Sequence, residues 1–136
     1  MALETRDYVE IQMLLGLYGH ILDDRDWDAL PRVFTEDIVF DAGDSGLGVM
    51  RGIAAIVERW REPFDGHPLG HYMTNVVISE DEDGTVRARS KHLGVRPGTI
   101  TLMTYDDVLR RTPDGWRLAE RVAKIQHRVR MFEPPA

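Results

Sequence analysis

The chain has 136 residues, of which 43% are hydrophobic and 29% charged, a composition typical of one soluble globular domain. Its 17 Lys and Arg against 23 Asp and Glu give a formal net charge of −6, which argues against a nucleic-acid partner, because such binding needs a clustered basic face. The absence of cysteine excludes disulfides, thiolate nucleophiles and cysteine-ligated zinc. No apolar run approaches the ~20 residues of a membrane span, and the first residues do not resemble a secretory signal. We therefore expect a cytoplasmic protein with no membrane partner.

The first half of the chain is predicted to be mainly helical. Apolar residues recur at helical spacing over Asp7–Leu22, which indicates an amphipathic helix. The elements expected next are a short helix over Trp27–Phe34, a strand at Ile38–Phe40, a loop or hairpin over Asp41–Gly48 and a helix over Ile53–Trp60 that Pro63 ends.

From residue 71 onward the hydrophobic period changes to two, which is typical of strands. The four long strands expected here are His71–Ser79, Thr85–Val95, Ile100–Arg111 and Trp116–Arg130, with turn-forming residues between them. Helices followed by a run of antiparallel strands predict an α+β fold, a single domain over residues 1–136 with helices on one face of a curved, mainly antiparallel sheet. We expect a pocket on the covered, concave face.

Two strands carry basic residues with different expected roles. Arg87, Arg89 and Lys91 share one face of their strand, which we interpret as a solvated outer face. Arg121 shares a face with Ala119 and Ala123, so its guanidinium either projects into space that the small neighbours leave open or points outward and pairs with an acid of the adjacent strand.

The residues with the clearest catalytic potential are His71 and Asp23. His71 opens the first strand after the helices, and Asp23 lies at the end of the helix expected to cover the cavity. A histidine held by a carboxylate on one ring nitrogen can act as a general base through the other. A purely structural histidine is the alternative. His67 and His71 do not form a helical zinc pair, because Pro68 and Gly70 lie between them.

Other residues are candidates for lining the pocket. The Tyr18 hydroxyl either reaches the cavity and donates a hydrogen bond to an oxyanion or leaving group, or stays within the core. Asn75 shares a strand face with His71 and Met73, although it can instead cap a strand end. The further candidate lining residues are Trp60, Phe64, Leu69 and Met103.

Three parts of the chain resemble the SnoaL-like proteins of the nuclear-transport-factor-2-like superfamily. They are the segments Asp23–Leu30 with Phe34–Asp37, His71–Val76 and Asp114–Leu118, and the resemblance covers roughly residues 5 to 130. It implies a cone-shaped α+β barrel.

Scytalone dehydratase, hexachlorocyclohexane dehydrochlorinase and bile-acid 7α-dehydratase belong to this group and work by base-promoted elimination. Their Asp and His match Asp23 and His71, a functional helix residue matches Tyr18, and a dehydrochlorinase arginine matches Arg121. The chain departs from scytalone dehydratase where that enzyme has two tyrosines and a second histidine; Leu22, Ala42 and Ser90 stand at these positions.

Together, the residues and the resemblance predict a lyase that uses no cofactor and no metal, and that acts on a small, largely apolar or polycyclic substrate. His71 would be the base, Asp23 its partner, Tyr18 a hydrogen-bond donor and Arg121 an anchor for negative charge. The alternatives are an isomerase or polyketide cyclase with the same dyad, and a non-catalytic module that binds a small ligand. We also expect a homo-oligomer, a dimer or a trimer, because open sheet edges need covering.

Overall fold

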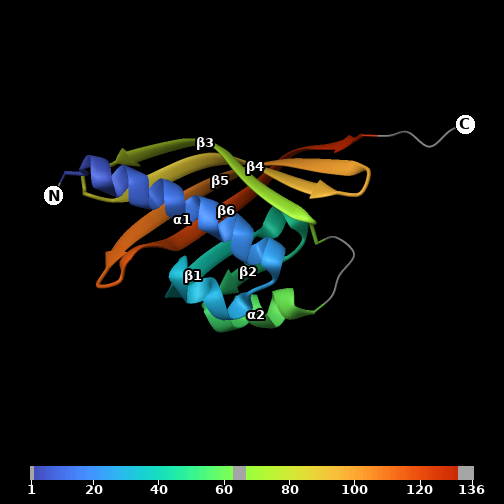
Figure 1. Ribbon diagram of the computed structural model, residues 1–136, viewed down its shortest axis with the longest axis horizontal. Helices are drawn as coiled ribbons and strands as arrows, with labels where there is room; N and C mark the ends of the chain where they lie inside the picture. Colours follow the sequence, from blue (N-terminus) through green and yellow to red (C-terminus); the bar gives the residue numbers. More distant parts are fainter. Residues whose placement is uncertain (1, 63–66, 132–136) are drawn as a thin grey trace, which may run out of the picture.

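The computed structural model describes residues 2–62 and 67–131 and contains two α-helices over a six-stranded sheet (Figure 1). The helices are α1 (Thr5–Asp24) and α2 (Ile53–Arg61), with short 3-10 helices at Trp27–Arg32 and Gly43–Ser45. The strands are β1 (Phe34–Ala42), β2 (Gly48–Arg51), β3 (Gly70–Glu80), β4 (Val86–Arg96), β5 (Thr99–Thr112) and β6 (Gly115–Arg130). Pro63 and Phe64 lie outside the described residues.

The sheet is ordered β2-β1-β6-β5-β4-β3, so β2 and β3 form its two edges. Neighbouring strands are antiparallel except β1 and β6, which pair in parallel. The long helix α1 crosses one face of the sheet, and α2 lies beside β1 and β2 (Figure 1). The predicted α+β class is confirmed, with a curved sheet that stays unclosed in the described part of the chain.

The segment between α1 and β1 differs from the prediction. The short helix is a 3-10 helix that ends at Arg32, and β1 begins at Phe34 rather than at Ile38. The backbone N–H of Leu118 donates to the Val33 carbonyl at 2.8 Å, so β6 draws this segment into the sheet. The exposed polar pair Glu36 and Asp37 interrupts the apolar pattern at a shift in the β1–β6 register, and the sequence pattern therefore hides the first half of the strand.

Helix α1 is attached to the sheet near both of its ends. Near its start, the buried carboxylate of Asp7 accepts hydrogen bonds from Trp116 Nε1 at 3.0 Å and from Arg111 Nη2 at 2.9 Å. Near its end, Asp23 accepts from the backbone N–H of His71 at 3.0 Å. All three bonds join residues far apart in sequence, so they fix the direction in which the helix crosses the sheet.

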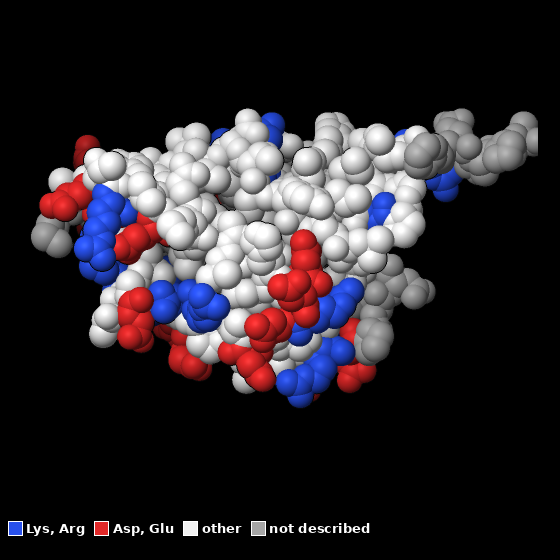
Figure 2. Space-filling model, viewed as in Figure 1, with Lys and Arg blue, Asp and Glu red and all other residues white. Residues whose placement is uncertain are grey.

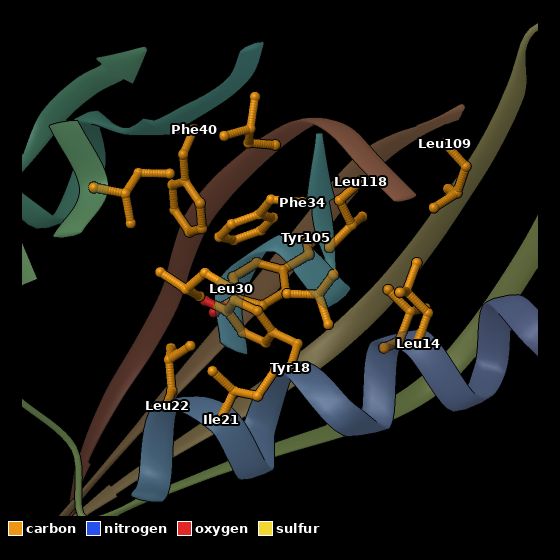
Figure 3. Close-up of a cluster of buried hydrophobic side chains, with 14 of the residues drawn as sticks. Leu14, Tyr18, Ile21, Leu22, Leu30, Phe34, Phe40, Tyr105, Leu109 and Leu118 are labelled. Carbon is orange, nitrogen blue, oxygen red and sulfur yellow. The ribbon is translucent and has the colours of Figure 1, made fainter. Parts of the chain in front are cut away.

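Between α1 and the sheet lies the hydrophobic core (Figure 3). Tyr18 of α1 points at Phe34 and Tyr105, and Phe40 lies beyond them, all in tilted or edge-to-face contact with ring centroids 5.9 to 6.5 Å apart. Such arrangements are the favoured ones for aromatic rings.

The outer face of β4 is basic and exposed, as predicted. Arg87, Arg89 and Lys91 are exposed, whereas the residues that alternate with them are buried. On the face of the molecule shown in Figure 2, acidic and basic side chains are interspersed over the lower half. Among the described residues, neither helix is long and apolar enough to cross a membrane.

Candidate active site

A cavity of about 390 Å³ opens on the covered face of the sheet. Its volume lies in the range of roughly 300 to 1,000 Å³ that small-molecule sites occupy. Helices α1 and α2 contribute Tyr18, Leu22 and Trp60, and the sheet contributes, among others, Phe40, His71, His92, Met103 and Tyr105. The predicted pocket on the covered face is therefore present.

Asp23 and His71 are in direct contact. Asp23 Oδ1 lies 2.7 Å from His71 Nδ1 and also accepts the backbone N–H of His71 at 3.0 Å. A carboxylate only accepts hydrogen bonds, so Nδ1 carries the ring proton and Nε2 keeps its lone pair. The His71 side chain is 5% exposed and that of Asp23 29%, so the imidazole faces the cavity while its partner stays partly hydrated.

Polar aromatic rings form a continuous row from the cavity's edge into the core. His67 meets His71 edge-on at 5.6 Å, and His71 stacks on His92 at 5.3 Å. His92 in turn stacks on Tyr105 at 4.8 Å, and Tyr105 meets Tyr18 at 6.0 Å. The cavity therefore has nitrogen and hydroxyl groups along an otherwise apolar wall.

The three imidazoles of this row are held in the neutral form. Burial lowers the pKa of His92 to about 3 and that of His67 to about 4. The pKa of His71 is also lowered from its ordinary value, mainly by burial, although the hydrogen bond and the charge of Asp23 oppose this shift. A neutral His71 at physiological pH is ready to accept a proton.

Tyr18 and Arg121 belong to a buried cluster at the inner end of the row. The Arg121 guanidinium donates to both carboxylate oxygens of Asp107, at 2.7 and 2.8 Å, and its carbon lies 4.4 Å from the Tyr18 ring centre and 4.0 Å from that of Tyr105. Burial disfavours the charge on Arg121, but Asp107 outweighs it and raises the pKa of the guanidinium. Burial raises the pKa of Tyr18, so its hydroxyl stays protonated.

This arrangement corrects one expectation for Arg121. The side chain is inward and fully buried, yet it pairs with an acid of the adjacent strand and is absent from the cavity lining. Each of the two interpretations from the sequence is therefore right in part: Arg121 points inward, and it also pairs with an acid of the adjacent strand. The rings of Tyr18 and Tyr105 lie against its guanidinium.

The predicted lining residues divide into two groups. Trp60 and Met103 line the cavity. Met73 packs beside the core, and Leu69 is 66% exposed, so neither lines it. Asn75 is exposed at an irregularity of the β3–β4 pairing with φ of 54°, so it neither points into the cavity nor shares the inward face of His71.

His92 and Tyr105 are cavity residues that the sequence analysis did not select. The chain was expected to present Ser90 where scytalone dehydratase has its second histidine, but the ring beside His71 is that of His92. Ser90 pairs with Tyr105 farther along the strand and is 1% exposed. The alternation in β4 gave the available signal, because it places His92 on the buried face.

Within residues 2–62 and 67–131, no group of three or more His, Cys, Asp or Glu side chains is arranged to hold a metal ion. Although the His67 and His71 rings are in contact, His67 precedes β3 outside the described helices and strands, and no helix presents the two together.

Comparisons with known proteins agree with this fold. A model of the SnoaL-like domain matches residues 3–122. An uncharacterised protein of Mycobacterium tuberculosis is 33% identical over 130 residues, which cover 88% of this chain and 85% of that protein. A solved structure from Novosphingobium aromaticivorans, of a protein proposed to be an aromatic ring hydroxylase, shares 30% identity with a TM-score of 0.78 over 96% of each chain. A type 2 hexachlorocyclohexane dehydrochlorinase shares the fold, with 17% identity and a TM-score of 0.74 over 97% of this chain and 99% of that one.

Proposed function

The chain belongs to the SnoaL-like family, and from this premise we propose that it is a lyase that removes a proton and expels water or a similar leaving group from a small, largely apolar substrate. The observation that carries the proposal is the 2.7 Å contact between Asp23 and the Nδ1 atom of a neutral, cavity-facing His71. This contact leaves Nε2 as the only basic atom of the ring.

In the proposed reaction, His71 Nε2 takes a proton from a carbon next to a carbonyl group. The electron pair of that C–H bond forms a C=C bond, and the bond from the neighbouring carbon to its hydroxyl oxygen breaks. The departing hydroxyl takes up the proton and leaves as water, which returns His71 to its neutral form. Asp23 stabilises the imidazolium that exists between these two transfers.

In the proposed reaction, two groups would stabilise the developing negative charge. Tyr18 lines the cavity with a protonated hydroxyl, and His92 is a neutral imidazole whose two nitrogens have no hydrogen-bond partner among the described residues. Each can donate one hydrogen bond to a substrate oxygen. Arg121 acts through the Tyr18 and Tyr105 rings against which it lies, as a positioning residue.

The proposal is tested with a panel of β-hydroxy ketones on one-ring to three-ring frames, with products identified by mass. We expect loss of one water from at least one compound. His71→Ala should slow that reaction by about 10²- to 10⁴-fold, the usual contribution of a general base. His20→Ala is the matched control, because His20 is an exposed histidine of α1.

Each other outcome has a defined meaning. A product of unchanged mass that needs His71 would indicate an isomerase or cyclase instead. Full activity of His71→Ala would exclude the dyad as the base. Saturable binding without turnover, unchanged in His71→Ala, would favour a binding module.

A further inference from the structure

The cavity has a basic end in an acidic protein. Among its described lining residues are Arg59, Arg96 and Arg128, and none of those lining residues is Asp or Glu. The whole chain has a net charge of −6, so the arginines of the cavity lining have the opposite sign to the molecule as a whole. Such a local reversal favours an anionic ligand over a neutral one.

Arg96 and Arg128 flank a buried threonine at the end of the cavity nearest the β4–β5 turn. Arg96 Nη1 donates to Thr101 Oγ1 at 2.8 Å, and Thr101 is 4% exposed. Arg128 faces Thr101 in the β5–β6 register. Burial and the charge of Arg128 lower the pKa of Arg96, so an anion placed here would relieve repulsion between like charges.

Gly94 connects this basic end with the proposed base. It pairs with His71 on one side and with Thr101 on the other, so these two residues lie at the same level two strands apart, about 10 Å at the usual strand spacing. A Cβ atom at Gly94 would lie 3.4 Å from His92 Cε1 and 3.7 Å from Arg96 Nη1. The Arg96 guanidinium therefore reaches back beside His92, inside the same cavity as His71.

We propose that the ligand of this cavity carries a carboxylate, which Arg96 and Arg128 bind beside Thr101 while its apolar frame lies along the row of rings. A guanidinium matches the planar carboxylate with two parallel N–H groups, which a hydroxyl or a ketone oxygen cannot use equally well. The inference rests on the proposed function in that it concerns the same cavity, and it names the class of substrate: an aromatic or polycyclic acid whose carboxylate is bound two strands away from the strand that carries the base.

The experiment compares 2-naphthoate with 2-naphthalenemethanol, which differ in charge but share an apolar frame. Binding is measured by calorimetry and by NMR shifts of the His71 and His92 rings. We expect the parent protein to bind the carboxylate at least about tenfold more tightly, the size of one charge-assisted hydrogen bond. Arg96→Gln and, at an exposed position, Arg128→Gln should each reduce that preference.

Arg89→Gln is the matched control. It removes the same charge from β4, but on the outer face, and should leave the preference unchanged. Because Arg128 is exposed, its variant should keep the fold even where Arg96→Gln does not. Equal affinity for the two compounds, absence of saturable carboxylate binding, or a preference that persists in both variants would overturn the proposal.

The same measurement in His71→Ala separates this inference from the proposed reaction. Carboxylate preference should survive in His71→Ala, because the anion site does not use the base. A protein that eliminates water but ignores the carboxylate would refute only the anion site. A protein that binds the carboxylate but has no dyad-dependent turnover would refute only the lyase.

Discussion

At the scale of single residues, the central feature is one carboxylate oxygen that holds both the backbone and the ring of the same histidine. Asp23 Oδ1 accepts from His71 N and from Nδ1, so the position and the tautomer of the proposed base are fixed by one atom. A ring held in this way needs no reorganisation before it accepts a proton, which is the condition for efficient general base catalysis.

Replacing Asp23 with Asn should lower the pKa of His71 further. In the parent, burial already lowers this pKa, while the hydrogen bond and charge of Asp23 raise it; Asp23→Asn removes the raising contribution. Ring-nitrogen NMR over a pH titration measures both the pKa and the tautomer. The parent should show a protonated Nδ1 and an unprotonated Nε2 above the pKa, and the variant should lose that fixed tautomer.

The ring resonances of the exposed His20 serve as the internal control. A pKa of His71 that rises in Asp23→Asn, or does not change, would show that the carboxylate does not support the imidazolium.

The lowered pKa of His71 also predicts how the reaction rate depends on pH. The rate should hold to more acidic pH than a free imidazole allows, and should fall only when Nε2 becomes protonated.

Sequence reasoning found the dyad but not its surroundings, for reasons that differ from residue to residue. The pattern marks Asp23 as part of a helix end and His71 as the start of a strand, and the resemblance to the SnoaL-like proteins singled out the two as a pair. Asn75 was misplaced because an irregular strand pairing, with a left-handed φ, turns its side chain to the exposed side. Arg121 was expected at the cavity because its pairing with Asp107 depends on the β5–β6 register, which the pattern leaves open.

At the scale of elements, the distance between α1 and β3 decides whether the dyad forms. A Cβ atom at Gly19 would lie 2.7 Å from the His71 carbonyl oxygen, closer than real Cβ contacts allow. Glycine is therefore required at this crossing, since a larger residue would separate the helix that carries Asp23 from the strand that carries His71.

Gly19→Ala should destabilise the protein by about 1 to 3 kcal/mol, the usual cost of overpacking, and should shift the His71 ring resonances. Gly16→Ala is a matched control one turn earlier, where a Cβ meets nothing within 4 Å. That variant should be stabilised by about 0.5 to 1 kcal/mol, because alanine favours helix over glycine. Urea unfolding measures both values, and equal effects in the two variants would contradict the close crossing.

At the scale of the whole molecule, the order of helices and strands was enough to predict the class of fold. Four long segments of period two became β3 to β6, with bounds within two residues of those expected. The parallel β1–β6 pair and the first half of β1 were not accessible, because they depend on contacts between segments that lie far apart in the chain. The arginines Arg96 and Arg128 of the cavity lining likewise lie on either side of Thr101 only once the strands are in register.

The folded protein also carries a neutral histidine that resists protonation, and this links its stability to pH. His92 is 2% exposed with a pKa of about 3, whereas an unfolded chain has a histidine pKa of about 6.5. Below pH ~6.5 the unfolded state binds a proton that the folded state does not, so stability falls as pH is lowered toward the folded pKa, by up to about 1.4 kcal/mol per pH unit.

The variant His92→Phe tests this link, because it keeps a stacking ring without a titrating group. The free energy of unfolding of His92→Phe, measured in urea between pH ~4.5 and ~7, should therefore rise relative to that of the parent as the pH falls. A difference between His92→Phe and the parent that stays constant with pH would mean that His92 is not held neutral.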